Sequence, residues 1–190
     1  MVDRVRGRGL GGDGSGDTGK TDGTEQTDPH DRYNQPARDV TGPFVPDDFE
    51  VPVSLSGPGF RLEPLGPEHN DSDHRAWTSS IEHIRSTPGL PWGSWPPVGG
   101  LSLAENLRDL RQHAEDFKQR AGFTYTVLAD DDQVIGCVYI YPSRQEPGVT
   151  NVRSWVTETR AELDTVLYRT VSDWLAAEWP FATVSYRDNP

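Results

Sequence analysis

Two short patterns in this chain contain residues that can bind phosphate or metal. Gly14 to Thr21 reads Gly-Ser-Gly-Asp-Thr-Gly-Lys-Thr and fits the phosphate-loop pattern GxxxxGK[ST]. Such a loop needs a buried strand before it and a helix that starts at the lysine, so that backbone N–H groups face the phosphates. Glycine-rich and acidic residues stand on both sides instead. We therefore expect a tail segment here and not a nucleotide site.

The second pattern, His69-Asn70-Asp71-Ser72-Asp73-His74, gathers side chains that can ligate a metal. Its spacing fits no standard metal site, and Asp71 or Ser72 is a typical cap before a helix. Cys137 is the single cysteine and lies within an apolar strand pattern. A small buried side chain is expected there, because a nucleophilic cysteine needs an exposed, electropositive setting. The sequence predicts no metal site.

Two pairs of aromatic residues are candidates for substrate contacts. Tyr139 and Tyr141 lie two residues apart in a strand pattern, so their side chains share one face. Trp92 and Trp95 lie in the Pro- and Gly-rich stretch 88–97, which cannot form regular structure. Each pair has two interpretations, contact with a bound molecule or packing in the core. The residues alone leave both open.

The elements that would position these residues follow from apolar periodicity and capping signals. Ser102 and Glu105 form a capping box, and Leu103, Leu107 and Leu110 begin the apolar face of a helix that continues through Ala114 and Phe117 to a stop at Gly122. The full prediction is a strand at 60–65, helices at 71–85 and 102–122, strands at 123–129, 134–141 and 152–157, a helix at 160–178 and a strand at 182–186. This β-α-α-β-β-β-α-β order predicts an α+β fold, a mixed, mostly antiparallel sheet with helices on both faces.

Composition divides the chain near residue 50 and limits its partners. Of 190 residues, 19 are Gly and 16 are Pro, and the formal net charge is -12. Residues 1–50 carry only isolated large apolar side chains, so we expect a disordered acidic tail there and a single folded domain over 51–190. An acidic chain repels phosphate backbones, which argues against nucleic acid as a partner. Since no apolar run approaches a bilayer-spanning length and no signal peptide is recognisable, we expect a cytoplasmic protein without a membrane partner.

The element order resembles that of the GCN5-related N-acetyltransferase (GNAT) superfamily. The resemblance covers 60–187 and includes the opening Arg61-Leu62-Glu63-Pro64-Leu65, the strand 134–141 after an acidic turn, and the long helix after Trp155-Val156-Thr157. It implies acetyl-CoA as co-substrate and a small-molecule or peptide amine as acceptor. It also implies two final strands that splay apart, with the pantetheine arm of the coenzyme between them.

The same resemblance assigns roles to individual residues. Backbone groups of Val156 and Thr157 would hold the pantetheine arm, and Arg160 would contact a phosphate. Acetyl transfer also needs a base, and Glu158, directly after the strand, is the nearest carboxylate. Its other interpretation is a solvated residue near a helix start, where negative charge is favourable. Trp92, Trp95, Tyr139 and Tyr141 would line the acceptor cleft. Thr159 to Asp164 reads Thr-Arg-Ala-Glu-Leu-Asp and lacks the glycines of the family's [Q/R]-x-x-G-x-[G/A] signature.

Two further expectations remain. The glycine-free segment is consistent with an alternative, a GNAT-shaped binding or regulatory module that has lost acetyl-CoA chemistry. The last strand has an open edge, which favours pairing with a second copy of the chain.

Overall fold

A six-stranded sheet forms the centre of the domain. The computed structural model describes residues 43–90 and 95–187. The strands lie in the order in which they occur in the sequence: β1 (Leu55–Gly57), β2 (Phe60–Pro64), β3 (Phe123–Leu128), β4 (Val134–Pro142), β5 (Thr150–Val156) and β6 (Val184–Tyr186). The first four neighbouring pairs are antiparallel and the last, β5 with β6, is parallel. The predicted mixed sheet is confirmed.

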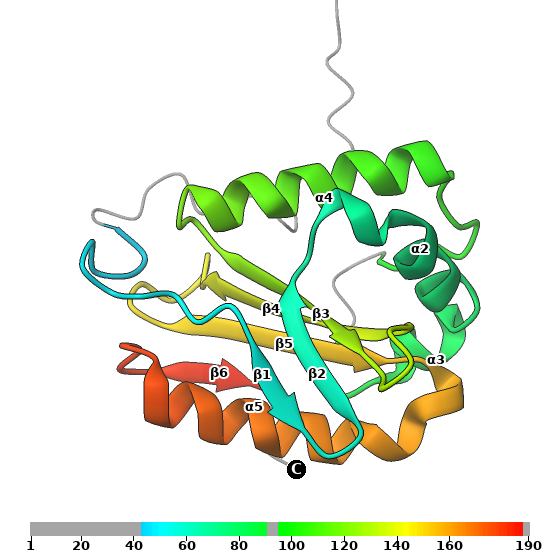
Figure 1. Cartoon of the computed structure of the whole chain (residues 1–190). Coiled ribbons are helices and arrows are strands. Elements are labelled where there is room, and N and C mark those ends of the chain that lie inside the picture. The colour runs from blue at the N-terminus through cyan, green and yellow to red at the C-terminus, as the bar shows by residue number, and fades with distance from the viewer. Residues whose placement is uncertain (1–42, 91–94, 188–190) are drawn as a thin grey trace, which may run out of the picture.

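Helices cover both faces of this sheet, as predicted (Figure 1). One face carries α2 (Asn70–Thr78), α3 (Ile81–Ser86) and α4 (Leu103–Lys118), with the short 3₁₀ helix η1 (Pro67–His69) before them. The other face carries α5 (Asp164–Glu178), which follows the 3₁₀ helix η2 (Glu158–Leu163). Side chains of β5 divide between two apolar clusters: Val152 and Val156 pack with α5, and Trp155 packs toward α2 and α4.

Local structure differs from the prediction in three places. The helix expected over 71–85 is broken at Ser79 and Ser80, and Ser80 has a non-helical backbone. The helix expected from residue 160 begins at Asp164, because Arg160 departs from helical geometry within η2. A strand that was not predicted, β1, pairs with β2 at the edge of the sheet.

The buried face of α4 is more polar than the sequence indicated. The capping box of Ser102 and Glu105 is present, but Leu103 is 42% exposed. Asn106, His113 and Asp116 are buried instead, next to Leu110. These polar residues form hydrogen bonds with residues of α2 and the sheet. Because these partners satisfy them, they can be buried where the apolar pattern predicted leucine.

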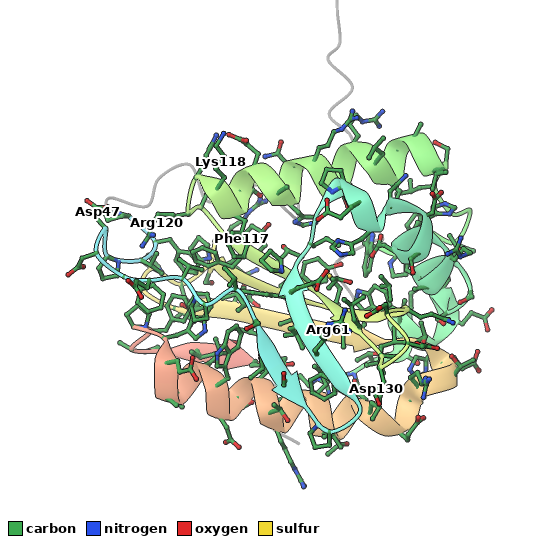
Figure 2. The ribbon with its side chains drawn as sticks, viewed as in Figure 1. Asp47, Arg61, Phe117, Lys118, Arg120 and Asp130 are labelled. Carbon is green, nitrogen blue, oxygen red and sulfur yellow. The ribbon has the colours of Figure 1, made fainter. Side chains whose placement is uncertain are left out.

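The folded domain includes residues that the composition assigned to the tail. Val45 is 1% exposed, and Phe44 stacks on Phe123 and Phe181 with ring centroids 5.7 and 5.0 Å apart. Arg120 lies beside this loop, which carries Asp47 (Figure 2), and its guanidinium donates to the carbonyls of Pro46 and Phe49. Ordered packing therefore starts before the predicted boundary at residue 51. The phosphate-loop pattern at 14–21 lies outside the described residues.

None of the helices in the described ranges is long and apolar enough to cross a membrane.

Candidate functional site

The sheet opens between β5 and β6. Their parallel pairing covers Thr150–Val184, Asn151–Ser185 and Val152–Tyr186, and β6 then ends. Strand β5 continues for four more residues, from Arg153 to Val156. The far half of β5 thus extends past its neighbour, and this is the place where the resemblance expects two strands to splay.

Backbone groups of β5 point into this opening in alternation. The amide of Thr150 donates to the carbonyl of Thr183 on the β6 side. Successive residues of a strand direct their backbone groups to opposite edges, so Ser154 and Val156 share the direction of Thr150. The backbone of Thr157 faces the opposite edge, toward β4, and its amide donates to the carbonyl of Ile135 at 2.7 Å. Of the two residues predicted to hold a pantetheine arm, Val156 faces the opening with its backbone, whereas the Thr157 amide is used within the sheet.

A partly buried ionic cluster fills the mouth of the opening. Arg187 follows β6 in a left-handed conformation, with φ +52°. Its two terminal nitrogens bind both carboxylate oxygens of Asp164, at 2.7 and 2.5 Å, and one of them also donates to the Ser154 hydroxyl at 3.2 Å. Tyr186 completes the cluster through a 2.6 Å hydrogen bond between its hydroxyl and that of Ser154. The cluster joins the end of β6 to the first residue of α5.

Electrostatic interactions favour the charged form of Arg187 in this partly buried cluster. Burial alone lowers the pKa of the Arg187 guanidinium, but the hydrogen bonds and charge of Asp164 reverse that effect and leave the pKa above its usual value. A cation–π contact also favours the charged form of Arg187, since its guanidinium carbon lies 5.3 Å from the centroid of the Tyr168 ring. Burial raises the pKa of Tyr186 well above its usual range, so this phenol stays protonated.

Two pockets share lining residues at the end of β6. The larger, of about 510 Å³, runs along α5 and is lined by Tyr168, Leu175 and Phe181 among others. The smaller, of about 260 Å³, lies between the β4–β5 turn and the loop after α3 and is lined by polar residues that include Glu146 and Arg153. Ser185 and Arg187 line both pockets. The arrangement offers two molecules separate approaches to one point in the sheet.

Two backbone amides of the segment between β5 and α5 have identified partners. The amide of Glu158 donates to the Ser80 hydroxyl at 3.0 Å, and that of Arg160 donates to the carbonyl of Thr157. The side chains of Glu158 and Arg160 are both exposed. Glu158, the predicted base, and Arg160, the predicted phosphate contact, therefore follow β5 within four residues, and both side chains reach solvent. The carboxylate of Asp164, at the start of α5, is paired with the guanidinium of Arg187.

The predicted acceptor residues lie on the α2–α4 face. Trp95 is 8% exposed and packs against Trp77, Tyr139 and Trp155, with ring centroids 6.2–6.4 Å away. The Tyr139 hydroxyl accepts a hydrogen bond from the Trp155 indole at 3.3 Å. These contacts favour the core interpretation for Trp95 and Tyr139. Trp92 lies outside the described residues.

Tyr141 shares its face of β4 with Tyr139, as predicted, and belongs to a polar network. Its hydroxyl lies 2.9 Å from His113 Nδ1 and 3.1 Å from an Asp116 carboxylate oxygen. Thr124 contacts both His113 and Tyr141 through its hydroxyl. Burial raises the pKa of Asp116 and, to a larger degree, that of Tyr141. Within the described ranges no group of three or more His, Cys, Asp or Glu side chains is placed to hold a metal ion.

Sequence reasoning missed the residues at the centre of the opening: Ser154, Asp164, Tyr186 and Arg187. Strand alternation from Trp155 does place Ser154 on the α5 face. Arg187 itself has the left-handed backbone conformation that ends β6. Glycine or asparagine usually marks such a position in a sequence, and here the residue is arginine.

Comparison with solved structures identifies the fold. No family model and no curated protein matches this sequence. The structure is similar to ribosomal-protein-S5-alanine acetyltransferase from Vibrio fischeri, with 14% identity, a TM-score of 0.56, and coverage of 71% of this chain and 73% of that one. It is also similar to the microcin C7 self-immunity acetyltransferase solved with acetyl-CoA and AMP, with 8% identity, a TM-score of 0.51 and 67% coverage of each chain. A ribosomal L7/L12 alpha-N-protein acetyltransferase gives a TM-score of 0.50 at 9% identity, over 71% of this chain and 68% of that one. The fold is GNAT-like.

Proposed function

We propose that this protein is an acetyl-CoA-dependent N-acetyltransferase that acts on a small-molecule or peptide amine. The observation that carries the proposal is the opening past the Val152–Tyr186 pair, where β5 continues without β6. It supports binding of an extended, amide-containing arm, because backbone groups of Ser154 and Val156 face the opening and can pair with it as a strand would. The three similar structures named above are acetyltransferases, and one of them was solved with acetyl-CoA.

The residues present fit this co-substrate at three points. The β5 backbone supplies partners for the pantetheine arm, the first residue of α5 lies at the same opening, and Arg187 supplies a partly buried positive charge there. Acetyl-CoA supplies an activated acetyl group as a thioester. The two pockets that share Ser185 and Arg187 would accommodate the co-substrate and the amine.

The chain's part in the transfer is to orient the amine and to accept its proton. As the neutral amine attacks, a C–N bond forms and the C–S bond breaks, and the amine proton ends on the departing thiolate by way of a base. Glu158 is the proposed base, because its carboxylate is exposed directly after β5 and its backbone is fixed by Ser80. The net charge of -12 favours the approach of cationic amines, which lose their proton at the site.

The test is a calorimetric titration of the full chain with acetyl-CoA, followed by measurement of thiol release with a panel of amines. We expect binding in the micromolar range and release that depends on the amine added. Thermal unfolding should shift upward with acetyl-CoA concentration, because a ligand that binds the folded state stabilises it.

A second candidate is a GNAT-shaped binding or regulatory module without transfer activity. The glycine-free segment Thr159–Asp164 favours it, together with the Arg187–Asp164 pair that fills the mouth of the opening. Absence of acetyl-CoA binding at millimolar concentration supports this candidate and contradicts the first.

A further inference from the structure

The smaller pocket, of about 260 Å³, reaches the start of the opening beside β5. Its lining includes Glu146 on the β4–β5 turn, Arg153 on β5 and Arg187 after β6. Arg153 is the first residue of β5 beyond Val152–Tyr186, the last pair with β6. A small molecule in this pocket would therefore lie next to the part of β5 that is proposed to hold acetyl-CoA.

Three of the residues that line the pocket are charged, and they differ in their surroundings. The charge of Arg187 is compensated by Asp164, which binds its guanidinium through both carboxylate oxygens. Glu146 is exposed on the β4–β5 turn, before β5 begins. Arg153 is half-buried and directly adjoins the opening. The charge closest to the opening along β5 is therefore positive.

Contacts from two elements orient the guanidinium of Arg153. Its Nε donates to Asn151 Oδ1 at 3.1 Å, and its Nη1 donates to the carbonyl of Gly89 at 3.3 Å. Asn151 shares its face of β5, two residues earlier, and Gly89 belongs to the loop after α3. The bond to Gly89 is exposed to solvent, so a ligand can reach this end of the guanidinium. An oriented, accessible guanidinium matches the planar geometry of a carboxylate.

We propose that this pocket binds the acceptor as a free α-amino acid, and that Arg153 is a specificity-determining residue that binds its carboxylate. The proposal rests on the acetyltransferase function proposed above. One carbon separates the carboxylate from the amine of an α-amino acid, so a carboxylate held at Arg153 keeps the amine close to the opening. The pocket volume lies near the lower end of the range for ligand sites, about 300 Å³, which suits a molecule of this size.

The product of this reaction is an N-acetylamino acid. The amine nitrogen forms a C–N bond to the acetyl carbon, the C–S bond of the thioester breaks, and the amine proton passes by way of a base to the CoA thiolate. The N-terminus of a peptide offers a neutral carbonyl where the amino acid has its carboxylate. The charge of Arg153 thus favours free amino acids over peptides.

The first experiment measures thiol release by the full chain with matched acceptors, each common α-amino acid and its carboxamide. The amide keeps the size of the acceptor and removes its negative charge. It also lowers the pKa of the amine, so the informative quantity is the change in the acid-to-amide ratio of kcat/KM between two proteins. Arg153→Gln should lower this ratio about tenfold, the smaller end of the range for a hydrogen bond to a charged group. The loss should come from a higher KM for the acid, with kcat nearly constant.

Arg169→Gln is the matched control, because Arg169 is an exposed arginine on α5, and it should leave the ratio unchanged. A ratio in Arg153→Gln equal to that of the unmodified protein overturns the proposal and leaves the acetyltransferase function intact. Acetylation of peptides without acetylation of any free amino acid has the same meaning. Failure of the full chain to bind acetyl-CoA overturns both.

A second measurement uses the unmodified protein alone and does not depend on the folding of a variant. The analogue of the best acceptor that lacks the amine is prepared as the acid and as the amide. The acid should inhibit transfer in competition with the amino acid, and the amide should inhibit at least about tenfold less, since it lacks the charge that Arg153 binds. Equal inhibition by the two analogues contradicts recognition of the carboxylate.

Discussion

At the scale of single residues, the pairing of Asp164 with Arg187 changes how the site is interpreted. In the sequence, Asp164 is a carboxylate near the expected position of phosphates. In the structure it neutralises a guanidinium that comes from the other end of the domain, 23 residues later. Charge at the start of α5 is thus set by a tertiary contact. This contact also connects the positions of β6 and α5.

Asp164→Ala should destabilise the fold by about 2 kcal/mol. Removing one partner of a buried ion pair costs about 3–5 kcal/mol, and the 22% exposure of Asp164 reduces that figure. Chemical denaturation measures the effect. Asp173→Ala, on the exposed side of the same helix, is the control and should change stability by less than about 0.5 kcal/mol. Equal effects of the two substitutions would contradict the role of the pair.

Glu158→Gln should lower the rate of acetyl transfer by about 10²–10⁴-fold, the usual contribution of a general base. The affinity for acetyl-CoA should stay nearly constant, since Glu158 is assigned to the amine. Glu162→Gln is the matched control, because Glu162 is an exposed carboxylate of the same 3₁₀ helix. Similar rates for the two variants would exclude Glu158 as the base.

Asp73 should make stability depend on pH. Burial raises its pKa from 3.8 to about 6, partly offset by a hydrogen bond from Asn106. Between these values the folded protein retains a proton that the unfolded chain releases, so the free energy of unfolding falls as pH rises from 4 to 6. The loss is about 3 kcal/mol at 1.36 kcal/mol per pKa unit.

The comparison that isolates this effect is Asp73→Asn, which keeps an oxygen for Asn106 and does not titrate. The nearby charged groups Asp109, His69 and His74 remain in both proteins. The difference in unfolding free energy between the two proteins should therefore change across pH 4–6 and be constant above about pH 7. A difference that is independent of pH would contradict the shifted pKa.

At the scale of elements, the loop at 43–50 contributes to the core although its composition resembles the tail. Phe44, Val45 and Phe49 lie on the cluster around Phe123 and Trp179, and Arg120 fixes the loop carbonyls. Short apolar segments between prolines carry no periodicity, so their packing depends on a surface formed elsewhere in the chain. The sequence therefore placed the start of the domain too late.

Two truncated chains test the contribution of this loop. A chain that starts at residue 43 should have a free energy of unfolding within about 1 kcal/mol of that of the full protein. A chain that starts at residue 51 should lose several kcal/mol, because Phe44 and Val45 leave cavities in the core. Equal stability of the two truncated chains would show that the loop does not support the fold.

At the scale of the whole molecule, the sequence predicted the architecture better than the site. Strands and helices with clear periodicity, such as those predicted at 123–129, 134–141 and 160–178, were found close to these positions. The site depends on where β6 ends relative to β5, and on which side chain then crosses the opening. Arg187, Asp164 and Ser154 lie on three elements, and no local pattern links them. Only the packing of these elements brings the three residues together.

The central claim is that acetyl-CoA occupies the opening between β5 and β6. The most direct test is a ¹⁵N NMR titration of the full chain with acetyl-CoA. We predict that the amide signals of Ser154 and Val156 move with saturable dependence on ligand, together with the Arg187 Nε–H signal, while those of Arg61 and Glu63 on β2 stay in place. Unchanged signals for Ser154, Val156 and Arg187 at millimolar acetyl-CoA would contradict the account.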